Sequence, residues 1–170
     1  MKLSPAALAV AVALFAAVPT LAHEGMLHDG CATGQSFAAG DLTVTGGFAR
    51  ATLPNAPVGA GYLTIENKGT ADRLVSAASD VTPTVELHNM ETADGMMKMI
   101  HLEAGIDIPA GATVSLAPGG LHVMFIGPNQ PFKEGECVAV TLSFEKAGPL
   151  EVQLVVGPVG ADAAPDHAGH

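Results

Sequence analysis

Apolar and polar residues alternate along most of the chain that follows residue 40. In residues 138–145, for example, Val138, Val140, Leu142 and Phe144 alternate with small or polar residues. A period of two is expected of a β-strand that buries one face. The same pattern predicts nine strands, at residues 41–48, 61–67, 73–78, 85–90, 97–102, 113–116, 121–126, 138–145 and 150–156.

Turn-forming residues separate these predicted strands. Pro118-Gly119-Gly120 and Gly127-Pro128-Asn129 are two of several such stretches, and each is typical of a chain reversal. The sequence has no convincing helical period and no internal repeat. We therefore predict an all-β domain, a Greek-key barrel or sandwich of eight or nine antiparallel strands.

The first 22 residues have the pattern of a targeting segment. Lys2 is followed by an apolar run at residues 6–18, then by Pro19 and by small residues that end at Ala22. This order is typical of a secretory signal peptide, and the run is shorter than the ~20 residues that span a bilayer. We therefore predict cleavage before His23 and export to the periplasm, with no membrane span in the mature chain.

The rest of the chain divides into three parts. Residues 23–40 are an N-terminal extension, residues 41–157 hold the strand pattern, and residues 158–170 are expected to be a flexible tail that contains His. The net charge of −10 favours solubility and is the opposite of the basic surface that nucleic-acid binding requires. We expect one monomeric domain that does not bind nucleic acid.

The sequence contains two cysteines, Cys31 and Cys137. In an exported protein, two cysteines predict one disulfide, which here would close a long loop. A metal or redox site made by the thiols is the alternative, although the two residues do not form a Cys-x-x-Cys pair.

Histidine and methionine recur together on the predicted strands. His88 and Met90 are two residues apart and share one face of their strand, and His122 and Met124 do the same. A single methionine more often fills a gap in a core, but in both strands the opposite face is the more apolar one. The intervening strand adds a further set of same-face donors: Met97, Met99 and His101.

These donor types favour one metal ion. Thioether sulfur is soft and selects Cu(I), and imidazole also suits copper. A zinc site would more often combine His with Cys or carboxylate, and Ca²⁺ or Mg²⁺ would need oxygen ligands. The sequence therefore predicts a Cu(I) site, whose affinity should fall as the histidines are protonated.

The spacing of the donors resembles the signature of the periplasmic copper chaperones known as PCuAC. That signature is a His, a Met eleven residues on, and a His-x-Met about twenty residues later, which here are His88, Met99, His122 and Met124. The resemblance spans roughly residues 41–157. Its other matching stretches are Ala49-Arg50-Ala51-Thr52, Gly61-Tyr62-Leu63-Thr64-Ile65, Val85-Glu86-Leu87-His88, Met97-Lys98-Met99, Ile108-Pro109-Ala110-Gly111 and Pro118-Gly119-Gly120-Leu121-His122.

The resemblance implies a cupredoxin-like β-barrel that holds Cu(I) near one end with His88, Met99, His122 and Met124. It also implies a carrier that passes Cu(I) to the copper centres of cytochrome c oxidase. The partner would be the copper-accepting oxidase subunit or another periplasmic copper chaperone. A blue-copper centre would instead need a Cys thiolate beside two His, and Cys137 has no His nearby in the sequence.

Three features extend or depart from this pattern. Met90 is an alternative ligand, or a side chain that covers the copper without binding it. His101 replaces a more usual basic residue and is either an extra donor or a surface residue. Phe48 stands where similar proteins often have Trp.

The two termini carry a second set of donors. His167 and His170, with Asp166, and His23 near the other end offer nitrogen and oxygen atoms that would suit Cu(II). The alternative is an exported leader and tail without a metal.

Three other functions are alternatives to copper delivery. Copper sequestration for resistance would use the same site. A copper brace for oxidation chemistry would need His23 and a second His, and no partner stands at strand spacing. A β-sandwich without metal is the remaining alternative. No catalytic triad, carboxylate pair or phosphate loop is evident, so we predict a binding protein and not an enzyme.

Overall fold

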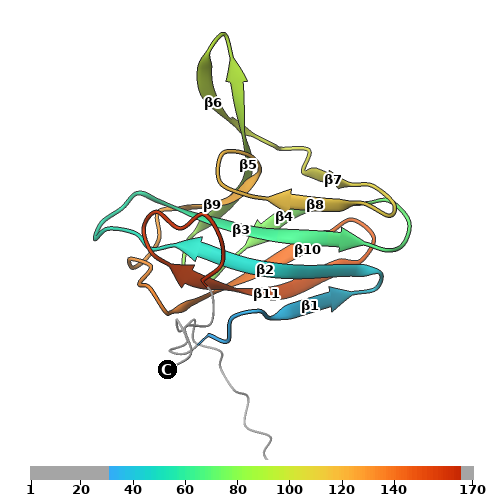
Figure 1. Cartoon of the computed structure of the whole chain (residues 1–170), viewed down its shortest axis with the longest axis horizontal. Coiled ribbons are helices and arrows are strands. Elements are labelled where there is room, and N and C mark those ends of the chain that lie inside the picture. Colours follow the sequence, from blue (N-terminus) through green and yellow to red (C-terminus); the bar gives the residue numbers. More distant parts are fainter. Residues whose placement is uncertain (1–30, 166–170) are drawn as a thin grey trace, which may run out of the picture.

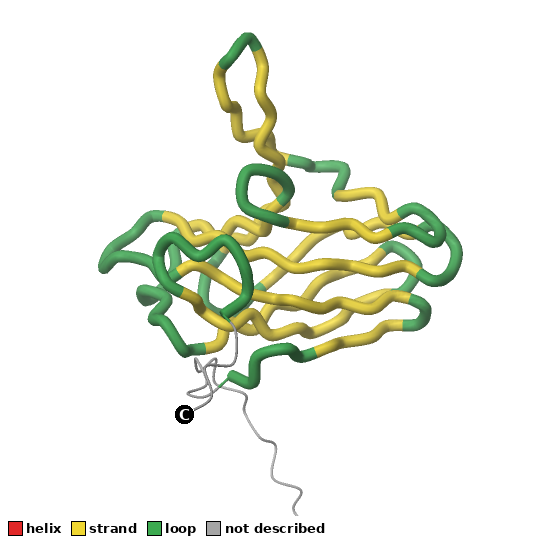
Figure 2. Tube along the Cα trace, in the orientation of Figure 1, coloured by secondary structure: helices red, strands yellow, loops and turns green. Residues whose placement is uncertain are grey.

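The computed structural model describes residues 31–165 of the 170-residue chain. These residues form eleven β-strands and no helix (Figures 1 and 2). In chain order the strands are β1 Ser36–Ala39, β2 Leu42–Arg50, β3 Val58–Asn67, β4 Asp72–Ala78, β5 Thr84–Ala93, β6 Met96–His101, β7 Ile106–Ile108, β8 Thr113–Leu116, β9 His122–Ile126, β10 Cys137–Phe144 and β11 Gly148–Gly157. None of the described residues belongs to a helix with the length and hydrophobicity that a membrane crossing needs.

Several of the sequence predictions fall on residues that the structure does not describe. The predicted signal peptide lies there, as do His23, His167 and His170 and residues 23–30 of the N-terminal extension. The Cu(II) hypothesis for the termini therefore stays a prediction.

All eleven strands belong to one sheet. Its order is β6-β5-β9-β3-β2-β11-β10-β4-β7, with β1 paired to β2 and β8 paired to β3. The all-β prediction is confirmed. The expectation that every pair is antiparallel is wrong at one place, since β2 and β11 run parallel, with Phe48 opposite Val155. Side chains alternate in the same way in both kinds of pair, so the sequence pattern could not distinguish them.

Nine of the strands correspond to those predicted, and β1 and β7 are additional. β7 has only three residues, and β1 holds the apolar run Phe37-Ala38-Ala39, which does not alternate with polar residues. β1 adds to β2 at one side of the sheet, and β7 adds to β4. Their backbone pairing, and not a hydrophobic pattern in their own sequence, defines them.

The sheet curls around one hydrophobic core. Side chains from strands far apart in the sheet order meet in it, among them Leu63 of β3, Leu74 of β4, Phe125 of β9 and Leu142 of β10, all at most 1% exposed. Burial of such side chains stabilises the fold by roughly 1.5–3 kcal/mol each. The curled sheet leaves the part of the β5–β6 hairpin beyond His88 outside this core.

The β5–β6 hairpin projects from one side of the sheet (Figure 1). β5 pairs with β9 from Thr84 to His88, and it pairs with β6 from His88 to Ala93. His88 therefore marks the place where the sheet ends and a two-stranded arm begins. The two strands of the arm are joined at Asp94 and Gly95, both with positive φ (53° and 75°), as a two-residue hairpin turn requires.

Cys31 and Cys137 form a disulfide, with their Cα atoms 5.3 Å apart. The predicted pairing is confirmed, and no free cysteine is present in residues 31–165. The bond fixes the segment that precedes β1 to the first residue of β10. The cysteines therefore make no thiol metal site.

Candidate metal site

Three histidines lie in register across neighbouring strands. In the backbone pairing, His101 of β6 is opposite His88 of β5, and His88 is opposite His122 of β9. Directly opposed residues of an antiparallel pair share a face of the sheet. The rings of His88 and His101 stack with centroids 5.2 Å apart, and those of His88 and His122 are 5.7 Å apart.

Methionines flank this row of histidines on the same face. Met99 is opposite Met90, two residues along β5 from His88, and Met124 is opposite Glu86 on the other side of the row. Residues two apart in a strand share a face. The structure thus brings the four residues of the predicted signature onto one face of β6, β5 and β9: His88, Met99, His122 and Met124.

The opposite face of β9 and of the first part of β5 is packed into the core. Leu87 is 3% exposed, and Val123 and Phe125 are fully buried. The two histidines of the signature are also buried, with His88 8% and His122 5% exposed, while half of Met99 is exposed. The site therefore has buried nitrogens and an accessible sulfur.

His88 has one ring nitrogen occupied and one without a partner. Its Nε2 lies 2.7 Å from Oε2 of Glu86, which accepts a hydrogen bond from it. Its Nδ1 is buried and has no hydrogen-bond partner within residues 31–165. In the neutral ring, a proton on Nε2 leaves the lone pair on Nδ1. A buried lone pair without a donor is costly, and a metal ion would satisfy it.

His122 is hydrogen-bonded through Nδ1, whereas His88 is hydrogen-bonded through Nε2. Its Nδ1 donates to the carbonyl oxygen of Gly120 at 3.0 Å, so the lone pair of the neutral ring is on Nε2. Burial lowers the pKa of His122, the hydrogen bond to Gly120 opposes this, and the nearby His88 lowers it further. The ring is therefore neutral over a wider pH range than an ordinary histidine, which is the form that binds metals.

A hollow of about 460 Å³ opens beside the histidine row. Three of the signature residues line it, namely Met99, His122 and Met124, together with the backbone and side chains of residues 50–60 and Val159. Met90 and the fourth signature residue, His88, do not line it. The hollow gives an ion or a partner side chain access to the thioether and imidazole donors.

Aromatic side chains support His122 from the barrel side. The ring of Tyr62 lies 6.4 Å from that of His122, and the ring of Phe48 lies 4.9 Å from that of Tyr62. The guanidinium of Arg50 lies 5.5 Å from the Tyr62 ring centroid. Phe48 packs in a buried cluster with Tyr62.

Two further residues, His101 and Glu86, contact His88. The sequence left the role of His101 open and gave no role to Glu86. His101 is on the surface, with 43% of its side chain exposed, yet it stacks on His88 and its Nδ1 lies 3.9 Å from Glu86. Glu86 was not predicted. The signal was present, because Glu86 and His88 are two residues apart and share a face, but only the structure shows their hydrogen bond.

The donor set is mixed nitrogen and sulfur. Within residues 31–165, no three or more His, Cys, Asp or Glu side chains are grouped so that they could hold a metal. This face presents three histidines, with thioethers on either side of the row.

Comparisons with known proteins identify the family and the fold of the chain. Residues 42–156 match the family LpqE-like, described as "Putative lipoprotein LpqE-like". The chain is 34% identical over 93 residues to the putative lipoprotein Lxx21020 of Leifsonia xyli subsp. xyli (strain CTCB07). That match covers 54% of this chain and 56% of the relative, so the chain spans about half the length of that relative.

Solved structures with the same fold include copper-binding domains. The copper-bound PCuAC domain from PmoF2 is 25% identical, with a TM-score of 0.62 over 73% of this chain and 98% of that one. Apo-DR1885 from Deinococcus radiodurans is 29% identical, with a TM-score of 0.55 over 84% and 96%. The Cu(I) form of DR1885 is 28% identical, with a TM-score of 0.54 over 75% of this chain and 83% of that one. The cupredoxin-like fold expected from the sequence is thus confirmed, and the chain belongs to the LpqE-like family, which is related to the PCuAC copper-binding domains.

Proposed function

We propose that this protein is a carrier of Cu(I), which it binds with Nδ1 of His88, Nε2 of His122 and the sulfurs of Met99 and Met124. The protein would act as a binding protein and not as an enzyme. Copper is its cargo, so the site must both hold the ion and release it.

The observation that carries this proposal is the buried, unpartnered Nδ1 of His88. It lies on the face where His122 also has one nitrogen left over after its hydrogen bond to Gly120. Two neutral imidazoles and two thioethers form a soft donor set that favours Cu(I) over harder ions. Copper binding by the PmoF2 and DR1885 domains, which share this fold, supports the choice of metal.

Glu86 contributes in two ways to the proposed site. Its hydrogen bond fixes the His88 tautomer and orients the ring, as carboxylates do for metal-binding histidines. Its negative charge also balances the single positive charge of Cu(I). A divalent ion would leave the site with an uncompensated charge in partly buried surroundings.

Of the two methionines on the hairpin next to His88, we assign the ligand role to Met99. Met99 lines the hollow together with His122 and Met124, and Met90 does not. Met99 is also half exposed, which gives a recipient protein direct access to one ligand of the ion. Transfer would then proceed by exchange of ligands, beginning at this sulfur.

We place this activity outside the cytoplasm, in the periplasm, as the predicted signal peptide and the relatives described as lipoproteins suggest. The disulfide between Cys31 and Cys137 fits an oxidising compartment. It also engages both cysteine sulfurs of the sequence, so neither is free to carry a lipid while the bond is intact. The proposed recipient is a copper centre of cytochrome c oxidase, reached directly or through another copper chaperone.

Titration with Cu(I) under anaerobic, reducing conditions tests the proposal. We expect one tight site in the wild-type protein, and its loss in the double variant His122→Ala/Met124→Ala. X-ray absorption of the loaded protein should report two nitrogen and two sulfur neighbours. Met96→Leu is the matched control, since Met96 is exposed on the hairpin and is not a proposed ligand. Full Cu(I) stoichiometry in the double variant would rule out the proposed ligands.

A further inference from the structure

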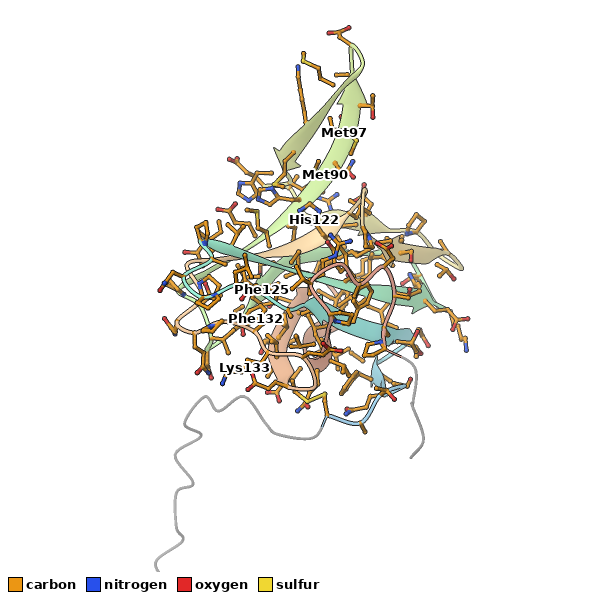
Figure 3. All side chains as sticks on the ribbon, turned by 60° about the vertical axis from the view of Figure 1, so that its left-hand side comes forward. Met90, Met97, His122, Phe125, Phe132 and Lys133 are labelled. Atoms are coloured by element: carbon orange, nitrogen blue, oxygen red, sulfur yellow. A yellow bond between two sulfur atoms is a disulfide. The ribbon has the colours of Figure 1, made fainter. Side chains whose placement is uncertain are left out.

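A second group of thioethers continues outward from the proposed copper site along the β5–β6 hairpin. Met90 and Met99 are directly opposed, and Met97 lies two residues nearer the hairpin turn than Met99. All three are on the face that carries His88, because residues two apart in a strand share a face. Figure 3 shows Met97, Met90 and His122 in this order from the arm toward the sheet.

The spacing of these methionines lets them share one ion. Directly opposed side chains of an antiparallel pair have Cβ atoms about 4.5–5.5 Å apart, and diagonal neighbours are about 7–8 Å apart. Met90 and Met99 are the opposed pair, and Met97 is diagonal to Met90. Methionine has three rotatable side-chain bonds, so its sulfur can move through several ångströms. Three sulfurs can therefore converge on one Cu(I) ion.

Exposure separates these sulfurs from the buried nitrogens. Met97 is 56% and Met99 50% exposed, whereas His88 and His122 are 8% and 5% exposed. An ion that arrives along the hairpin thus meets thioethers before it meets imidazoles. Thioethers bind no proton in the physiological range, so this outer group competes with no protonation and selects soft ions.

We propose that Met90, Met97 and Met99 form an outer, transient Cu(I) site through which the ion enters and leaves the inner site. Met99 belongs to both sites and keeps hold of the ion during the move. The bonds from copper to the sulfurs of Met97 and Met90 break as the bonds to His88 and His122 form. Copper remains Cu(I), and no electron is transferred. This inference rests on the proposed function.

The hairpin supplies a matched control for the test. Met96 is the neighbour of Met97 and is similarly exposed, at 60%. It pairs with Ala93 and lies on the other face of the hairpin, away from the row of donors. Replacing either methionine by leucine removes one exposed sulfur and keeps a similar apolar volume.

Stopped-flow mixing of the full-length apo-protein with the Cu(I)–bicinchoninate complex measures the rate at which copper is taken from a donor. We expect Met97→Leu to slow this uptake by about tenfold, the effect of a modest rise in the barrier. The Cu(I) affinity at the end point should stay within about twofold of wild type, because the inner ligands are unchanged. Met96→Leu should change neither the rate nor the affinity.

Two results would overturn the outer site. Equal uptake rates for Met97→Leu and Met96→Leu would show that Met97 takes no part in transfer. A fall in end-point affinity as large as that of Met99→Leu would make Met97 a ligand of the final site and not a transient one. Failure of the wild-type protein to bind Cu(I) at all would instead reject the proposed function itself.

Discussion

His88 and His122 are directly opposed between β5 and β9, and each is held through a different ring nitrogen. His88 is bonded through Nε2 to Glu86, and His122 is bonded through Nδ1 to the carbonyl of Gly120. The nitrogens left over are therefore Nδ1 of the first ring and Nε2 of the second. The sheet fixes both tautomers and a ring separation of 5.7 Å before an ion arrives. Such pre-organisation reduces the entropy lost on binding.

Removal of Glu86 should weaken copper binding without unfolding the protein. In Glu86→Ala, His88 loses the acceptor that orients it, and loss of such a partner typically lowers metal affinity by about 10–100-fold. Glu86→Gln should lose less, because the amide oxygen can still accept the Nε2 hydrogen bond. Competition titration with a Cu(I) chelator measures the affinity, and ¹⁵N NMR of the His88 ring reports its tautomer.

The control for this prediction is Glu91→Ala. Glu91 is an exposed carboxylate on the same strand, and its side chain is on the opposite face of the hairpin. We expect wild-type affinity and an unchanged His88 tautomer. An affinity for Glu86→Ala that equals that of Glu91→Ala would show that the carboxylate does not position His88.

The two methionines that face each other on the hairpin should differ in their effect on equilibrium affinity. Met99 lines the hollow with His122 and Met124, so Met99→Leu should reduce Cu(I) affinity by about tenfold or more, the loss of about 1.4 kcal/mol of binding energy. Met90→Leu should stay within about threefold of wild type. Competition titrations of the two variants decide between them. A larger loss for Met90→Leu would exchange the two assignments.

Much of the fold could be predicted from the sequence because alternation reports which face of a strand is buried. Val140 and Leu142 of β10 are fully buried, as their period of two indicated. The parallel partnership of β2 and β11 could not be predicted in this way, since pairing direction leaves no trace in the pattern. The strands β1 and β7 were missed because β7 has only three residues and the apolar run of β1 does not alternate with polar residues.

The candidate site was predictable in composition but not in its hydrogen bonds. Spacing placed His122 and Met124 on one face, and the backbone register of β9, β5 and β6 then brings His88 and Met99 onto it. The register depends on turn geometry and core packing, which the donors themselves do not encode. The contribution of Glu86 depends on a side-chain rotamer, so no residue spacing could establish it.

Loss of the disulfide should destabilise the protein and leave its copper site intact. The bond between Cys31 and Cys137 closes a loop with a sequence separation of 106 residues. Removing a native disulfide from a small exported domain typically costs about 2–5 kcal/mol in the free energy of unfolding. In Figure 1 the segment that precedes β1 lies on the side of the sheet away from the β5–β6 hairpin. Cys31→Ser/Cys137→Ser should therefore unfold at lower urea concentration and, where folded, bind Cu(I) with wild-type affinity. Wild-type stability in the double variant would contradict this prediction.

Asp72 should contribute a pH-dependent part of the stability. Burial raises the pKa of its carboxyl, but hydrogen bonds from the backbone N–H groups of Lys146, Arg73 and Ala147 outweigh this and lower it below the ordinary value of 3.8. The carboxylate thus links β4 to the turn between β10 and β11. Because the folded state holds this group at a lower pKa than the unfolded state, its contribution is present above pH 4 and is lost as the pH falls through the folded pKa.

Asp72→Asn should reduce the free energy of unfolding by roughly 1–2 kcal/mol at pH 7, a modest loss for a partly exposed group. The difference from wild type should shrink below pH 4 in urea titrations at several pH values. Asp107→Asn is the control, since Asp107 forms an exposed ion pair with Arg73 and should change stability little. A constant difference between wild type and Asp72→Asn from pH 7 to pH 3 would show that ionisation of Asp72 has no part in the effect.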